Sequence, residues 1–197
     1  MKIEIKKLTP ALAEDYAQFF DNTTHNNTGH GDKCYCITHC DDKVYRNGGT
    51  HWYPTRQERR HHAIQRVKDG SIQGYLAYHN NKIVGWCNAN TKSNCQEVVE
   101  YWRYGAGIPI DECQPGEKIK LIFCFVIAPA IQRTGIATQM LNHICQDANA
   151  NGFDFIEANT HTNFTQDGFR GPLALYEKCG FTKYAEKDGK IVVRKQL

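Results

Sequence analysis

The stretch IAPAIQRTGIATQML, residues 127–141, has a composition that suits the binding of an anion. An apolar run precedes it and an amphipathic pattern follows over 134–150, so we expect a strand, a loop over 132–137 and then a helix. The first N–H groups of a helix lack intrahelical acceptors, and the helix dipole adds positive character there. Gly135 would let the backbone approach a ligand closely. The pattern therefore predicts a phosphate-binding turn.

A second group of reactive side chains lies at 34–40, CYCITHC, where three cysteines and a histidine occupy seven positions. Structural zinc sites usually add a second closely spaced pair of ligands, and no C-x-x-C pair follows in this sequence. One regular element cannot present all four side chains on one side. We therefore expect no metal here, and interpret the thiols as small apolar groups that pack a core or a pocket wall. A cysteine-dependent metal or redox protein is the alternative.

The size and composition of the chain limit the class of protein. With 197 residues, 41% of them apolar and 23% charged, we expect one domain spanning 1–197. The N-terminus lacks a signal-peptide pattern and the run LIFCFVIA stops at Pro129, so we expect a cytoplasmic protein without a membrane partner, its nine cysteines reduced. The net charge is only +3, and the basic residues are mixed with acidic ones along the chain, which argues against the binding of nucleic acid. The densest basic cluster, 56–66, reads as the solvated face of a helix.

Hydrophobic periodicity indicates the elements that must position these residues. Thr55 and Glu58 form a capping box before the second helix. The run 118–128 is apolar enough for a central strand that is buried on both faces. Strands alternate with helices in the second half and a hairpin lies in the middle, so the fold class is α/β with a mixed sheet. We expect strands at 2–8, 118–128 and 153–159, helices at 11–20, 56–68, 134–150 and 172–178, and hairpins turning at 79–82 and 188–189.

Two motifs about 40 residues apart resemble the GNAT superfamily of acyl-CoA-dependent N-acetyltransferases. The pattern V-x-P-x-x-[QR]-x-x-G-x-[GA] is present as IAPAIQRTGIA at 127–137, and L-Y-x-x-x-G-F is present as LYEKCGF at 175–181. The order of the elements also fits, so the resemblance covers most of the chain. It implies an acetyltransferase with the GNAT fold, a central, mixed, mostly antiparallel twisted sheet of about six or seven strands flanked by about four helices.

The resemblance also implies a cofactor, acetyl-CoA, with CoA as the product. The backbone of Phe125, Val126 and Ile127 would pair with the pantetheine arm as an extra strand. The turn would hold the pyrophosphate of CoA, and its residues are Gln132, Arg133, Thr134, Gly135, Ile136, Ala137 and Thr138.

The resemblance places Tyr176 near the sulfur of CoA. A phenol can protonate a leaving thiolate when it is close and oriented; the alternative is a core aromatic on an amphipathic helix. Family members often carry a carboxylate on the central strand that deprotonates the amine, whereas this strand contains Cys124 and no Asp or Glu. His161 and Glu157, beside the strand at 153–159, are candidate bases. Glu97 and Glu100 are alternatives, and a neutral amine would need no base.

The expected reaction transfers an acetyl group from acetyl-CoA to a primary amine of a small molecule or peptide by direct attack in a ternary complex. A non-catalytic acyl-CoA-binding or sensing module is the alternative. The segment 21–40 would lie over the acceptor, and the long link 160–171 would shape the entry to the site through Phe169, Arg170, Gly171 and Pro172. A homodimer would be ordinary for the family.

Overall fold

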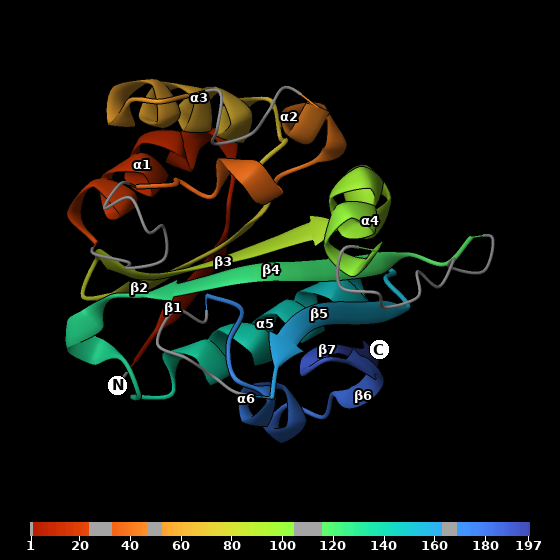
Figure 1. Ribbon diagram of the computed structural model, residues 1–197. Coiled ribbons are helices and arrows are strands. Elements are labelled where there is room, and N and C mark those ends of the chain that lie inside the picture. Colours follow the sequence, from red (N-terminus) through yellow and green to blue (C-terminus); the bar gives the residue numbers. More distant parts are fainter. Residues whose placement is uncertain (1, 24–32, 47–52, 105–115, 163–168) are drawn as a thin grey trace.

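The computed structural model describes residues 2–23, 33–46, 53–104, 116–162 and 169–197. Its centre is a seven-stranded sheet with the order β1-β2-β3-β4-β5-β7-β6 (Figure 1). Neighbouring strands are antiparallel except β4 and β5, which are parallel, so the expected mixed, mostly antiparallel sheet is confirmed. The strands are β1 (Glu4–Lys7), β2 (Gly74–His79), β3 (Lys82–Thr91), β4 (Ile119–Ile127), β5 (Phe155–His161), β6 (Thr182–Lys187) and β7 (Lys190–Gln196).

Helices cover both faces of this sheet. Figure 1 shows α1, α2 and α3 on one side, and α5 and α6 on the other. Among the described α-helices, α1, α3, α5 and the short α6 correspond to the four expected helices, whereas α2 and α4 were not expected. Among the described residues, no helix has the length and apolar character needed to cross a membrane. The α-helices are α1 (Ala13–Asn22), α2 (Asp42–Arg46), α3 (Arg56–Lys68), α4 (Gln96–Tyr104), α5 (Ile136–Ala150) and α6 (Leu173–Lys178), and the 3-10 turns are η1 (Pro10–Leu12), η2 (Ile37–His39), η4 (Lys92–Cys95) and η5 (Pro129–Ile131).

Strand β4 divides the core into two apolar clusters. Its residues from Ile119 to Val126 are all buried, which confirms the central strand expected from its continuous apolar run. Leu121, Cys124 and Val126 pack with α1 and α3, whereas Ile122 and Phe125 pack with α5 and α6. Side chains of a strand alternate between its faces, so one strand supplies both clusters.

The local turn and cap signals of the sequence form as expected. The Thr55 hydroxyl accepts the Glu58 N–H at 3.2 Å, and the Glu58 carboxylate accepts the Thr55 N–H at 3.0 Å. Asn80 and Asn81, between β2 and β3, both have positive φ, 49° and 59°, as a two-residue hairpin turn requires. The capping box therefore sets the start of α3, and the turn sets the register between β2 and β3.

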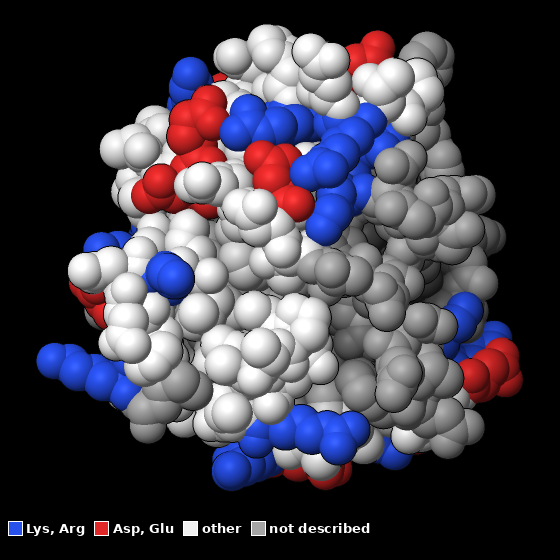
Figure 2. All heavy atoms as spheres, turned by 90° about the vertical axis from the view of Figure 1, so that its left-hand side faces the viewer, with Lys and Arg blue, Asp and Glu red and all other residues white. Residues whose placement is uncertain are grey.

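Helix α3 uses its basic residues for packing more than the sequence suggested. Arg59 is buried, and its guanidinium donates to the carbonyls of Tyr53 (2.7 Å) and Lys33 (2.8 Å). Arg60 pairs with Asp21 of α1 at 2.8 Å. In Figure 2, basic and acidic side chains lie side by side on the face of the molecule that it presents. The prediction of a solvated helix face is therefore wrong at Arg59, because this side chain binds one carbonyl just before α3 and another near the start of the segment 33–46.

Candidate active site

The pairing between the two parallel strands ends partway along them. The ladder runs from Ile119 opposite Phe155 to Ile122 opposite Ala158. Farther along, β4 still pairs with β3 as far as Ile127, and β5 pairs with β7 as far as His161. The β3–β4 register shifts between Asn88 and Ala89, as at a β-bulge, so β4 bends at this point. The last residues of β4 therefore have an edge that β5 does not cover.

Alternation of the backbone decides which residues of β4 face this uncovered edge. The N–H of Phe125 points away from β3, because it donates to the Phe169 carbonyl at 2.6 Å. Successive residues point their main-chain groups to opposite sides, so Ile127 faces the same edge as Phe125 and Val126 faces Trp86 of β3. Only Phe125 and Ile127 can therefore offer backbone groups there, which corrects the expectation for Val126.

The predicted phosphate-binding turn connects β4 to α5 through η5. Arg133 and Gly135 have positive φ, 63° and 85°. The Thr134 hydroxyl donates to the Ile131 carbonyl at 2.7 Å, and the Gln132 amide donates to the Ile127 carbonyl at 3.1 Å. These two side chains therefore brace the turn from within, and residues 132–135 are exposed.

Helix α5 begins at Ile136, two residues later than expected, because the left-handed backbone of Gly135 cannot be part of a right-handed helix. The Gln139 N–H is bonded to the Gly135 carbonyl at 3.0 Å, so the N–H groups of Ile136, Ala137 and Thr138 precede the first intrahelical bonds. No side chain caps this helix start in the described part of the chain. A Cβ at Gly135 would meet nothing within 4 Å, so the turn borders open space where an anion could sit.

Tyr176 lies in α6, directly beside the uncovered edge. Its side chain is fully buried, its ring contacts the Phe125 ring edge-on with centroids 6.5 Å apart, and its hydroxyl donates to the Arg170 carbonyl at 2.5 Å. Burial raises the pKa of Tyr176 well above its ordinary value, and Cys87 and Cys124 raise it further. The hydroxyl therefore keeps its proton through neutral pH.

Glu157 lies in a buried ion-pair network. Its side chain is fully buried, the Arg194 Nε donates to it at 2.8 Å, and the Lys92 Nζ is 3.1 Å from its other oxygen. A carboxylate that two cations neutralise is a poor proton acceptor. These contacts join η4, β5 and β7, which argues against Glu157 as the base among the candidates.

His161 is the other candidate base, at the end of β5 where the ladder with β4 has already ended. It is half-buried. Burial lowers the pKa of its imidazole, and the positive charges of Arg170 and Lys190 lower it further. The ring is therefore neutral at neutral pH, which is the form that accepts a proton.

The two alternative bases lie elsewhere. Glu97 and Glu100 belong to α4, which Figure 1 places at the opposite end of β4 from the turn into α5. The Glu97 carboxylate accepts a hydrogen bond from the Arg46 Nε at 2.7 Å, and the Glu100 carboxylate accepts one from the Gln96 amide at 3.1 Å. Their positions exclude direct action at the uncovered edge of β4.

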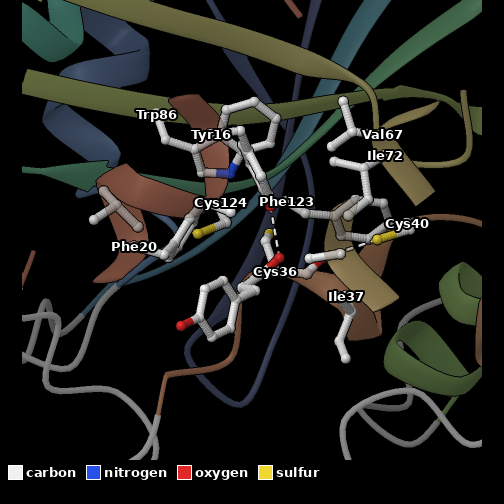
Figure 3. Close-up of a cluster of buried hydrophobic side chains, with 14 of the residues drawn as sticks. Tyr16, Phe20, Cys36, Ile37, Cys40, Val67, Ile72, Trp86, Phe123 and Cys124 are labelled. Carbon is white, nitrogen blue, oxygen red and sulfur yellow. Dashed lines mark hydrogen bonds between the residues drawn. The ribbon is translucent and has the colours of Figure 1, made fainter. Parts of the chain in front are cut away.

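Within CYCITHC, the side chains of Cys36, Ile37 and Cys40 are buried in the core cluster that also contains residues of α1 (Figure 3). The Cys40 thiol donates to the Cys36 carbonyl at 2.9 Å, and the Asn88 amide donates to the Cys36 sulfur at 3.3 Å. Within the described residues, no three potential ligands come together as a metal site would need. The packing interpretation is thus confirmed for Cys36 and Cys40.

Residues 169–171, called the strap below, bridge β4 and β5 with three successive carbonyls. Phe125 donates to Phe169, Tyr176 donates to Arg170, and the buried Thr160 hydroxyl donates to Gly171 at 2.6 Å. The sequence indicated the segment by the length of the 160–171 link, but not the role of Thr160. Residues 24–32 and 163–168, in the predicted acceptor and entry segments, lie outside the described residues.

A family comparison gives the assignment that this geometry suggests. The model of the "Acetyltransferase (GNAT) family" matches residues 37–181, which include the β4–α5 turn, the strap and Tyr176. The chain belongs to the GNAT family. It is therefore an acyl-CoA-dependent acetyltransferase, as the two sequence motifs predicted. No curated protein matches the chain.

Solved structures of GNAT proteins share the fold over the whole chain. A GNAT acetyltransferase from Streptococcus pneumoniae is 17% identical with a TM-score of 0.57, covering 100% of this chain and 99% of that one. Mosquito arylalkylamine N-acetyltransferase like 5b is 14% identical with a TM-score of 0.60, and both chains are covered completely. PaiA N-acetyltransferase from Thermoplasma acidophilum, in complex with coenzyme A, is 12% identical with a TM-score of 0.54 and complete coverage of both. The expected GNAT fold is confirmed.

Proposed function

We propose that this GNAT protein transfers an acetyl group from acetyl-CoA to a primary amine of a small molecule or peptide, by direct attack in a ternary complex. One observation carries the proposal: an exposed turn with unsatisfied helical N–H groups follows directly after the uncovered edge of β4. A long ligand with a polyanionic end and an amide-bearing arm fits both features together. We also propose that residues 1–197 form one domain, since the sheet draws strands from both ends of the chain.

The turn would bind the pyrophosphate of the cofactor. The N–H groups of Ile136, Ala137 and Thr138 would donate to phosphate oxygens, and the left-handed Gly135 lets them point into open space. A charge-assisted hydrogen bond contributes about 1.5–3 kcal/mol, whereas the helix dipole adds roughly 0.3–2 kcal/mol. Backbone geometry should therefore matter more than the side chains of Gln132, Arg133 or Thr134.

The acyl-bearing arm would lie along β4. Phe125 would donate its N–H to an amide carbonyl of pantetheine, and Ile127 would offer its main-chain groups farther toward the turn. This pairing adds a strand to the edge that β5 leaves uncovered. It also directs the thioester toward Tyr176, whose ring lies against Phe125.

The transfer needs one proton donor, one proton acceptor and close positioning. The amine nitrogen attacks the thioester carbon; the new C–N bond forms as the C–S bond breaks, and the sulfur leaves with the bonding electron pair. Tyr176 would give its proton to this thiolate, and the neutral His161 would take the proton of the amine. Holding both reactants in contact supplies most of the rate enhancement.

A thiol-release assay with acetyl-CoA and a broad panel of primary amines tests this function. We expect amine-dependent release of CoA, and we expect Tyr176→Phe to lower kcat about 100-fold or more without weakening the binding of acetyl-CoA. The phenyl ring keeps the packing against Phe125 and loses only the hydroxyl. A large loss of acetyl-CoA affinity with normal kcat would contradict the role of Tyr176. Binding of acetyl-CoA without release on any amine would indicate the non-catalytic alternative.

A further inference from the structure

The strap lies where the proposed cofactor arm would pair with β4. Phe169 accepts the Phe125 N–H at 2.6 Å, the bond that an amide carbonyl of pantetheine would make. One backbone N–H forms one good hydrogen bond at a time. The strap carbonyl and the cofactor carbonyl therefore compete for the same donor.

The strap also engages the proposed acid. Tyr176 has a single hydroxyl hydrogen, and it is directed to the Arg170 carbonyl at 2.5 Å. While this bond is formed, the hydrogen is unavailable to a leaving thiolate. The same short segment thus occupies both the binding donor and the proton donor of the site.

A third contact fixes the strap from the side of β5. The Thr160 hydroxyl donates to the Gly171 carbonyl at 2.6 Å, and Thr160 is buried. Gly171 has φ of 78° and precedes Pro172, which opens α6. Phe169 packs against the apolar cluster under α1 and α3. The strap is therefore tied at one end by Thr160 and Gly171, and at the other by Phe125 and Phe169.

From these contacts we infer that the strap is a built-in competitor of the cofactor: acyl-CoA binds by displacing Phe169 from Phe125, and the same movement frees the Tyr176 hydroxyl for catalysis. This inference rests on the proposed function. It makes Thr160 a positioning residue of the closed state. Only molecules with an open strap can bind the cofactor, so a larger closed fraction raises the apparent Kd. Substitutions that destabilise the closed strap should therefore tighten binding.

Calorimetric titration with CoA tests this coupling in Thr160→Val, which removes the hydroxyl and keeps the shape of the side chain. Losing one hydrogen bond from the closed state should lower the Kd for CoA about fivefold. Thr162→Val is the matched control, because the exposed Thr162 hydroxyl faces the Gly189 carbonyl of the β6–β7 hairpin instead. The control should bind CoA like the original protein. Phe169→Ala, which removes the packing of the strap, should shift the Kd in the same direction as Thr160→Val.

The outcomes separate the inference from the function on which it rests. Unchanged or weaker CoA binding by folded Thr160→Val and Phe169→Ala would overturn the competition, even if the original protein binds CoA well. No CoA binding by the original protein at millimolar concentration would contradict the proposed acyl-CoA site itself. If Thr160→Val does not fold, Phe169→Ala alone decides between tighter binding and the contrary result.

Discussion

Two buried ionisable side chains on the central strands have opposite surroundings. Glu157 is held by Arg194 and Lys92, so its charge is compensated within the core. Lys120 of β4 is also buried, but its ammonium group lies over the Phe153 ring, 4.3 Å from the centroid. Burial lowers the pKa of Lys120 from 10.5 to about 8, and the nearby Lys7 lowers it while Asp147 raises it. Substitution of these two residues should therefore change the stability of the protein in opposite directions.

Lys120 should make stability depend on pH in the alkaline range. The folded protein releases this proton near pH 8 and the unfolded chain near 10.5, so the unfolded chain binds more protons between these values. The free energy of unfolding should therefore rise from pH 8 to 10.5, by up to about 3 kcal/mol from this group. The Lys120→Met variant should be more stable than the original protein at pH 7, and its stability should lack this part of the rise. Urea unfolding at pH 7, 8 and 10.5 measures both effects. The exposed Lys118→Met is the control, and an identical pH dependence in the Lys120 variant would contradict the account.

Glu157 should contribute strongly to folding and not through proton transfer. Glu157→Gln removes the carboxylate that neutralises Arg194 and Lys92, and breaking a buried pair in this way costs about 3–5 kcal/mol. Glu186→Gln, which breaks the exposed pair with Lys183, should cost less than about 1 kcal/mol. Chemical denaturation of both variants measures the difference. A Glu157 variant of ordinary stability with a shifted pH–rate profile would instead restore its role as a base.

At the scale of elements, helix α5 has glycines of left-handed conformation at both ends, which gives a matched pair of variants. Gly135 has φ of 85° and Gly152 has φ of 70°, and a Cβ at either would meet nothing within 4 Å. Each Gly→Ala change should cost about 1–2 kcal/mol of stability through backbone strain alone. Only Gly135→Ala should weaken CoA binding, by about tenfold or more, because a relaxed turn misdirects N–H groups that each contribute about 1.5–3 kcal/mol. Equal loss of affinity in both variants would contradict the proposed phosphate site.

The elements that local patterns predicted are those with local causes. The capping box of α3, the Asn80–Asn81 turn and the β4–α5 turn depend on residues that are neighbours in the sequence. Helix α4 was missed, since its start is capped from α2, where the Asp42 carboxylate accepts the N–H groups of Glu97 (2.8 Å) and Val98 (3.2 Å). A cap that lies more than fifty residues away leaves no signal in a short window of sequence.

The strap and the ion-pair network show the same limit within the candidate site. Tyr176 and the turn could be found from motifs, and they lie beside one strand edge. That Phe169 would occupy the Phe125 N–H, or that Glu157 would meet Arg194, depends on strands that are adjacent only in the folded sheet. The residue type made Glu157 a candidate base, whereas its pairing with Arg194 and Lys92 in the folded sheet favours a structural role.

At the scale of the whole molecule, the site is a consequence of sheet topology. Strand β5 is parallel to β4 at its start and antiparallel to β7 along its full length, so it follows β7 after the ladder with β4 ends. Periodicity predicted each of these strands, but pairing between segments far apart in the chain requires the three-dimensional arrangement. The family match over 37–181 and the shared fold of GNAT structures support the same reading at this scale.

The binding of acetyl-CoA is the central claim, and thermal melting at increasing acetyl-CoA concentration tests it most directly. At a hundredfold excess over the Kd, binding should add about 2.7 kcal/mol to the free energy of unfolding. For a chain of this length, that corresponds to a rise in Tm on the order of 5–10 °C. A rise that saturates with ligand is the predicted result. An unchanged Tm at millimolar acetyl-CoA would contradict the assignment of the β4 edge and the turn at 132–138 as its binding site.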